Sequence, residues 1–254
     1  MERLAVITGA SSGLGKEFAR QLKKSGEATR FLLIARRRER LLALAEELGN
    51  AEILSLDLCK EQSIAEYVSY LKEKKEEVFY LINAAGFGKF GDYAHVSEKE
   101  TVDMIDLNVK ATVLMTHATL PFMQRGGHII EVGSGSCFTP LPHFNVYAST
   151  KSFVLHYSKG LRQEIKPLGV SVTCFCPGWV ETEFLGVAHP EDGARFPENP
   201  KPLLKAEHVV KYALSRAKHG KMLAVTNWYT KMQHMLFKLL PDRILTWLWL
   251  KTVL

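Results

Sequence analysis

The stretch TGASSGLGKEFARQL, residues 8–22, joins an apolar run to an amphipathic segment through three glycines. Glycine lets a backbone approach a ligand closely, and the free N–H groups at the start of a helix attract phosphate. The GxxxGxG spacing of Gly9, Gly13 and Gly15 differs from the GxGxxG dinucleotide fingerprint. By itself the stretch predicts a strand, a turn and a helix, and leaves open whether the turn binds phosphate or is only a tight connection.

Around this stretch, short β-branched runs alternate with segments of helical period. The strand candidates lie at 3–8, 30–35, 51–56, 78–83, 127–133, 170–176 and, more weakly, 221–225. Several of them are apolar throughout, as expected where helices cover both faces of a parallel sheet. The pattern predicts an α/β fold in one domain over 1–254: a Rossmann-like, doubly wound parallel β-sheet flanked by helices on both faces.

Composition narrows the class of protein. The chain has 254 residues, 46% hydrophobic and 24% charged, as is typical of a soluble globular protein. The net charge is +6, but the basic residues are mixed with Glu runs, so we expect no nucleic-acid partner. Four cysteines without metal-site spacing predict reduced thiols and no metal, and no targeting sequence precedes the first strand, so we expect a cytoplasmic protein.

Two later segments depart from the alternation. Residues 184–205 contain four prolines and two glycines, which predicts an irregular substrate lid. Residues 226–254 form an apolar tail, predicted to be helical, that combines Leu, Met, Phe and Trp with four basic residues. Its composition fits an oligomer interface, a cover over a substrate pocket or a weak contact with a membrane surface, and its longest apolar run is too short to cross a bilayer.

The sequence YASTK, residues 147–151, places a phenol and an ammonium four positions apart. On a helix such positions share one face, so Tyr147 and Lys151 are expected to point into the same space. The alternative is an ordinary helix start with a Tyr at its edge. Small, polar or glycine-containing groups also follow the predicted strands, where the ligand of a doubly wound sheet lies. These groups are DL at 57–58, NAAG at 83–86, GSGS at 133–136 and PGWVET at 177–182.

In the order and spacing of these motifs the chain resembles the single-domain short-chain dehydrogenases/reductases over roughly residues 3–225. The resemblance implies an oxidoreductase that transfers a hydride between a nicotinamide and a carbonyl or secondary alcohol, in a homodimer or homotetramer. It assigns catalytic roles to Asn108, Ser134, Tyr147 and Lys151. The cofactor-binding residues that it implies are Gly9, Ser11, Ser12, Gly13, Leu14, Gly15, Arg36, Asp57, Leu58, Asn83, Ala84, Gly86, Tyr147, Lys151, Pro177, Gly178, Val180 and Thr182.

The implied roles agree with the chemistry of the side chains. Tyr147 is the acid/base, and a phenol of pKa about 10 needs help to ionise near neutrality. Opposite charges about 4 Å apart attract by roughly 4 kcal/mol at an effective dielectric near 20, so Lys151 is expected to lower the pKa of Tyr147 by about two to three units. Ser134 binds the substrate oxygen, with Ser136 ranked second, and Asn108 holds a water that links the lysine to solvent.

The coenzyme expected is NADP(H). NAD enzymes of this fold usually carry an acid at the end of the second strand. Here that position is Ala35, followed by Arg36 and Arg37, and a guanidinium can bind a 2′-phosphate through two parallel hydrogen bonds. Ser12 stands where some NADP-dependent relatives have a basic residue, which leaves most of the discrimination to Arg36.

An apolar substrate, such as a steroid, an acyl chain or an aromatic ketone, is expected from the large side chains near the site, which serve equally well as core packing. They are Phe87, Phe90, Phe138, Leu141, Phe144, Trp179, Phe184 and Leu185.

The sequence leaves two other classes of function to consider. A non-catalytic NADP-binding sensor or scaffold predicts loss of the tyrosine, lysine or serine, all of which are present. A sugar-nucleotide epimerase needs a larger segment after Gly178 than this chain has.

Overall fold

The computed structural model describes residues 2–190, 197 and 202–253. Its centre is a seven-stranded parallel sheet in the order β3-β2-β1-β4-β5-β6-β9. The strands are β1 (Leu4–Thr8), β2 (Arg30–Ala35), β3 (Ala51–Ser55), β4 (Val78–Asn83), β5 (Met123–Val132), β6 (Ser171–Cys176) and β9 (Leu223–Val225). The predicted doubly wound, Rossmann-like sheet is confirmed, and the order of the strands reverses between β1 and β4.

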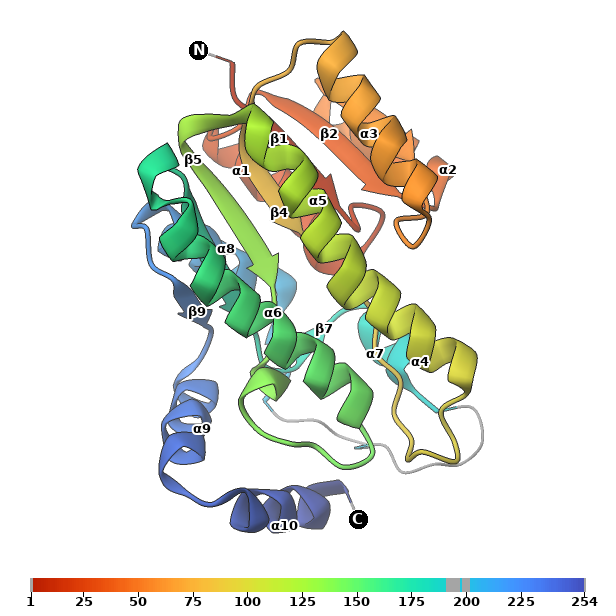
Figure 1. Ribbon diagram of the computed structural model, residues 1–254, viewed down its shortest axis with the longest axis vertical. Helices are drawn as coiled ribbons and strands as arrows, with labels where there is room; N and C mark the ends of the chain where they lie inside the picture. Colours follow the sequence, from red (N-terminus) through yellow and green to blue (C-terminus); the bar gives the residue numbers. More distant parts are fainter. Residues whose placement is uncertain (1, 191–196, 198–201, 254) are drawn as a thin grey trace.

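Helices cover both faces of the sheet because successive residues of each strand point to opposite sides. Ala5 and Ile7 of β1 pack in one apolar layer with α1 (Gly13–Ser25), α2 (Arg38–Leu48) and α8 (Ala206–Lys218). Leu4 and Val6 pack in the other layer with α3 (Glu61–Glu73), α5 (Thr112–Thr119) and α6 (Asn145–Glu164). Figure 1 shows α5 and α6 side by side over this second face. The two buried layers explain why the strands are apolar at consecutive positions.

A π-helical turn interrupts the long helical segment before β5. It is η1 (Asp106–Ala111), and it lies between α4 (Glu98–Ile105) and α5. The Ser97 hydroxyl accepts from the Glu100 N–H and the Glu100 carboxylate accepts from the Ser97 N–H, which fixes the start of α4. Such π turns occur frequently at functional sites, and this one buries Asn108.

The segment predicted as an irregular lid contains one short helix, α7 (Phe184–Ala188). Its first and last residues are four positions apart, and both pack into the same apolar cluster, which stabilises a single helical turn there. A two-residue parallel pair, β7 (Val180–Glu181) with β8 (Leu204–Lys205), joins the ends of the segment. Residues 191–196 and 198–201 lie outside the described part of the chain.

The C-terminal tail forms two helices, α9 (Trp228–Leu239) and α10 (Asp242–Val253), with Pro241 between them. In Figure 1 they lie at the end of the molecule farthest from the N-terminus, with α10 below the start of α6. Neither these nor the other helices of the described residues have the length and apolar content needed to cross a membrane. The remaining short helices are η2 (Leu120–Phe122), η3 (Gly135–Phe138) and η4 (Lys166–Leu168).

Candidate active site

A cavity of about 1210 Å³ lies at the carboxyl ends of the central strands. Loops from both halves of the sheet border it, as expected at the point where the strand order reverses. The predicted site residues that line it are Gly9, Ser11, Ser12, Gly13, Leu14, Arg36, Asp57, Leu58, Ala84, Gly86, Ser134, Tyr147, Lys151, Pro177, Gly178, Val180 and Thr182. Three predicted residues, Gly15, Asn83 and Asn108, do not line it.

The glycine-rich turn has a backbone that other residues adopt poorly. Gly9 and Gly13 have φ angles of 65° and 51°, in the left-handed region. A Cβ on Gly9 would lie 2.8 Å from the Ala84 carbonyl oxygen, and one on Gly15 would lie 2.5 Å from the Gly9 carbonyl oxygen. The turn therefore presses against the loop after β4. Helix α1 starts at this turn without an acidic residue in its first turn, so its N–H groups are suited to an anion.

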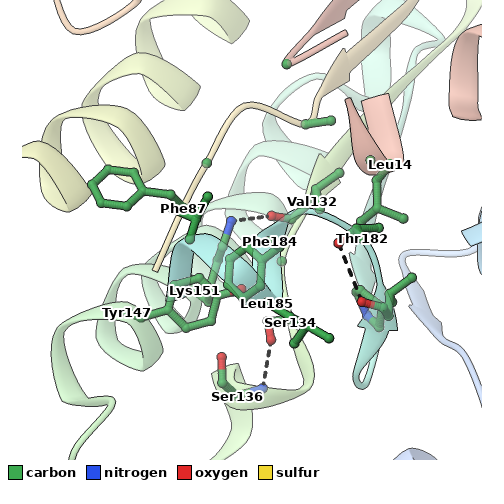
Figure 2. Close-up of a pocket in the computed structure, with 18 of the residues that line it drawn as sticks. Leu14, Phe87, Val132, Ser134, Ser136, Tyr147, Lys151, Thr182, Phe184 and Leu185 are labelled. Atoms are coloured by element: carbon green, nitrogen blue, oxygen red, sulfur yellow. Dashed lines mark hydrogen bonds between the residues drawn. The ribbon is translucent and has the colours of Figure 1, made fainter. Parts of the chain in front are cut away.

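Ser134, Tyr147 and Lys151 come together on one wall of the cavity (Figure 2). Tyr147 lies in the first turn of α6, with its ring stacked on Phe144 at a centroid distance of 4.4 Å. Ser134 follows β5 and lines the cavity on the same wall as Tyr147, and its hydroxyl accepts the Ser136 N–H at 3.2 Å. One turn along α6, the Lys151 ammonium lies 5.7 Å from the centre of the tyrosine ring.

The charged form of each group is disfavoured by burial. Burial raises the pKa of Tyr147 above its usual range, although the nearby Ser134 hydroxyl acts in the opposite direction. Burial lowers the pKa of Lys151 to about 8. The lowered pKa expected for Tyr147 is therefore wrong for this geometry. The reason is visible in the structure: the Lys151 ammonium donates to the Val132 carbonyl oxygen at 2.8 Å, and burial of the phenol raises the pKa of Tyr147.

Asn108 is fully buried and binds the loop after β4. Its amide nitrogen donates to the Phe87 carbonyl oxygen at 2.8 Å and to Thr150 Oγ1 at 3.1 Å, while its carbonyl oxygen accepts the Phe87 N–H at 3.0 Å. A Cβ on Gly86 would lie 2.8 Å from Asn108 Oδ1 and 3.3 Å from Lys151 Nζ. Asn108 and Lys151 thus approach the same glycine from two elements. The buried Asn108 amide is satisfied because it holds the loop after β4 through Phe87.

A buried polar network that the sequence reasoning missed lies behind this wall. Asn83 Nδ2 donates to Thr116 Oγ1 at 2.8 Å and to the Glu131 carboxylate oxygens at 3.2 and 3.1 Å. The Thr116 hydroxyl donates to Glu131 at 2.7 Å. Burial raises the pKa of Glu131 to about 7. Asn83 therefore ties β4 to β5 beneath the cavity. In the sequence, this network could have been found from Glu131, the single acidic residue in the otherwise apolar end of β5.

The arginines after β2 are not equivalent. Arg37 Nε and Nη2 donate to the hydroxyls of Ser11 and Ser12 at 3.1 and 2.6 Å. Glu183, next to α7, accepts from Arg37 at 2.8 Å and from Arg40 at 2.5 Å. Arg36 is exposed at the cavity edge and makes no hydrogen bond or ion pair through its guanidinium within the described residues. Sequence reasoning selected Arg36 and missed the link from Arg37 to Glu183.

Large apolar side chains form much of the remaining cavity wall, beside the charged residues Lys89, Lys99, Glu100 and Asp103. Of the large side chains predicted near the site, Phe90 and Phe138 lie outside the lining, because Phe90 stacks on Phe144 and Phe138 packs on His234. Those that line it are Phe87, Leu141, Phe144, Trp179, Phe184 and Leu185. The tail adds lining residues that were not predicted, namely Thr230, Met232, Leu236, Leu245, Leu248 and Trp249. The Trp249 indole N–H donates to the Pro142 carbonyl oxygen at 2.8 Å, so α10 packs over the site.

Residues 3–192 match the sequence profile of the family described as short chain dehydrogenase. The chain belongs to the short-chain dehydrogenase family. A curated relative, an uncharacterized oxidoreductase of Staphylococcus epidermidis, is 33% identical over 234 residues, which cover 89% of this chain and 96% of the relative. The predicted family and the oxidoreductase class are thereby confirmed.

Solved structures of short-chain dehydrogenases have the same fold. The enzyme of Sphingobium yanoikuyae in complex with NADPH is 29% identical, with a TM-score of 0.80 and coverage of 93% of this chain and 92% of that one. The bulky-bulky ketone specific alcohol dehydrogenase of Comamonas testosteroni is 25% identical, with a TM-score of 0.75 and coverage of 93% of both chains. Other matching structures hold NADP+ or NADH, so a nicotinamide dinucleotide is the supported cofactor class.

The residues at the glycine-rich turn of this dehydrogenase fit such a cofactor. The start of α1 and the left-handed glycines offer backbone N–H groups without a carboxylate. A Cβ at Gly13 would lie 3.4 Å from the Thr182 side chain, so a larger residue would fill the space between the turn and the loop after β6. The glycine-rich turn therefore leaves space at the positions where the resemblance implies contact with the dinucleotide.

Proposed function

We propose that the chain is an NADP(H)-dependent dehydrogenase/reductase that interconverts an apolar carbonyl compound and its secondary alcohol. The observation that carries the proposal is that Ser134, Tyr147 and Lys151 line one cavity between a phosphate-binding type of turn and an apolar wall. When bound, the coenzyme supplies or accepts the hydride. The side chains then have to bind the substrate oxygen and move one proton.

Tyr147 is the proton donor in the direction of reduction. Its raised pKa keeps the phenol protonated at neutral pH, so that a proton is available to an oxygen that develops negative charge. The hydroxyl of Ser134, on the same wall of the cavity as this phenol, orients the substrate oxygen against it. Lys151 stabilises the phenolate that remains, because an ammonium with a pKa of about 8 carries its charge at pH 7. Asn108 holds the loop at Gly86 beside this lysine.

The coenzyme is held, in this proposal, by the residues that the resemblance implied. The turn from Gly9 to Leu14 would hold the phosphates, and Asp57, Leu58 and the loops at Ala84–Gly86 and Pro177–Thr182 would hold the rest of the dinucleotide. The preference for NADP(H) comes from Arg36, which has no acidic neighbour at the end of β2. Gly15, Asn83 and Asn108 support this binding from outside the cavity lining.

The substrate class follows from the wall beyond Tyr147. Phe87, Phe144, Trp179 and Phe184 offer little to a charged or sugar-like molecule and bury apolar surface well. The specificity of the Comamonas relative for bulky ketones supports a large apolar ketone. The predicted homodimer or homotetramer stays a prediction, and light scattering of the purified protein measures it.

The test is oxidation of NADPH across a panel of steroid ketones, aromatic ketones, acyl thioesters and small dicarbonyls. Tyr147→Phe is expected to lower turnover of any accepted ketone by at least about 10², because only the ionisable hydroxyl is lost. The matched control is NADPH binding, followed by coenzyme fluorescence, which the variant should retain. Full turnover in folded Tyr147→Phe protein contradicts the role of Tyr147. Binding of NADPH without turnover of any compound favours the sensor or scaffold instead.

A further inference from the structure

Exposed apolar side chains gather on the two helices of the tail. Leu239, Trp228 and Met235 are 75%, 74% and 63% exposed. The other large apolar side chains exposed on α9 and α10 are Met232, Leu236, Ile244, Trp247 and Leu248. In the rest of the described chain an element carries at most two such residues, as Val102 and Ile105 on α4, which is normal for a globular protein. A cluster of exposed apolar side chains of this kind marks a surface that contacts another protein, a membrane or a ligand.

The charged residues of the same helices are mostly basic. Lys231, Arg243 and Lys251 are exposed on α9 and α10, against the single exposed acid Asp242. The Lys251 ammonium lies 4.0 Å from the centre of the Trp247 ring. Helices that lie in the headgroup region of a bilayer typically combine exposed tryptophan and leucine with lysine and arginine. The net charge of +6 of the whole chain acts in the same direction.

The exposed face of the tail continues into the cavity. Met232, Leu236 and Leu248 are exposed to solvent and also line the cavity, so the apolar rim of its opening belongs to this face. Leu245 is buried, and Trp249 is bound to the loop before α6, which anchors α10 to the body of the protein. The tail therefore has an inner side that closes the site and an outer side whose apolar side chains are exposed.

We propose that the outer face of α9 and α10 docks on the surface of an anionic lipid bilayer. The helices lie in the plane of the interface, because each is too short to cross the membrane. A rigid second copy of the chain on this face would cover the rim at Leu236 and Leu248, whereas a fluid acyl layer leaves an apolar substrate a path from lipid into the cavity. The docking needs no catalytic activity, and only the substrate path rests on the proposed function.

The experiment is co-sedimentation of the full-length protein with vesicles of phosphatidylcholine and phosphatidylglycerol, and with vesicles of phosphatidylcholine alone. Binding is expected to the anionic vesicles, and to weaken as salt concentration rises. The double variant Met235→Asp/Leu239→Asp is expected to reduce the vesicle partition coefficient by about tenfold or more. Neither residue lines the cavity, so turnover of a water-soluble ketone and the thermal midpoint should stay as in the unmodified protein.

The matched control is Leu42→Asp, which places the same charge at an exposed leucine of α2 and should leave vesicle binding unchanged. Equal vesicle binding by the double variant and the unmodified protein overturns the proposal. A second result also overturns the proposal. If the unmodified protein does not bind anionic vesicles, and the double variant loses the oligomeric state of the unmodified protein in light scattering, the face is a contact between copies. If no ketone reacts, the vesicle-binding and light-scattering results still test the docking, and only the proposed function is contradicted.

Discussion

Replacing Arg36 by alanine should weaken NADPH while leaving NADH almost unaffected. Strand β2 ends at Ala35, so no carboxylate stands where an acid would bind the ribose hydroxyls of NADH. Arg36 follows at the edge of the cavity with an exposed guanidinium that makes no hydrogen bond or ion pair within the described residues. Its charge is therefore available to a 2′-phosphate, a group that NADH lacks.

The size of the effect follows from this exposure. A hydrogen bond to a charged group contributes about 1.5 to 3 kcal/mol. Screening by water reduces the value for an exposed side chain, so we expect the lower end, about 1.5 kcal/mol, for Arg36. That corresponds to a roughly tenfold increase of the Kd for NADPH, with less than about a twofold change for NADH.

Two neighbouring residues serve as matched controls. Arg37 supports the glycine-rich turn through Ser11 and Ser12, so Arg37→Ala should weaken both coenzymes. Glu183 holds Arg37 and Arg40 in half-exposed ion pairs, each of the kind that contributes about 0.2 to 1 kcal/mol. Glu183→Gln removes the negative charge and releases Arg37, so it should tighten NADPH by roughly two- to fivefold.

The assay is a titration of each purified protein with NADPH and with NADH, followed by coenzyme fluorescence and repeated by calorimetry. The quantity that decides is the ratio of the two Kd values for each variant. Equal affinities of the unmodified protein for the two coenzymes refute the assignment of NADP(H). Equal weakening of both coenzymes by Arg36→Ala refutes the role of Arg36, because loss of a phosphate contact cannot change NADH binding.

Two further predictions concern the polar groups around Tyr147. Ser134→Ala should lower turnover strongly and Ser136→Ala much less, because the Ser134 hydroxyl acts on the pKa of the Tyr147 phenol and Ser136 Oγ has no partner within the described residues. The reverse ranking in steady-state kinetics would move the role to Ser136. Glu131, with its pKa raised by burial to about 7, binds its proton more tightly in the folded state, so its contribution to stability is present below about pH 4.5 and is lost as the pH rises through 7. Glu131→Gln should remove roughly 2 to 3 kcal/mol of this pH dependence in urea unfolding between pH 5 and pH 8, and an unchanged slope would contradict a protonated Glu131.

The sheet and the polar half of the site could be predicted because they are encoded locally. A strand buried on both faces is apolar at consecutive positions, and β2 and β4 were placed with the bounds that the structure has. The residues that follow each strand lie at its carboxyl end in any doubly wound sheet. Ser134 could therefore be placed at this edge of the sheet, and the family resemblance added Tyr147 to the same site.

The interactions that set the pKa values could not be predicted in this way. The Lys151 ammonium binds the Val132 carbonyl, a group that every residue possesses and that no motif marks. Glu131 receives Asn83 and Thr116 only because β4, β5 and α5 pack together. Local spacing shows which side chains share a helix face, whereas the balance between desolvation and attraction depends on all of the elements packed around them.

The apolar half of the cavity depends on contacts between residues that are far apart in the sequence. Helix α10 covers the site because Trp249 bonds Pro142 and Leu245 is buried beside it, and neither contact has a signature in the tail itself. The reaction can be inferred from strand ends, whose chemistry is fixed by position. In the proposed function the substrate is selected by the apolar side chains of α7, α9 and α10 that line the cavity. Met232, Leu236 and Leu248 both line the cavity and belong to the exposed apolar face, so the proposed lipid surface would lie next to the proposed substrate pocket.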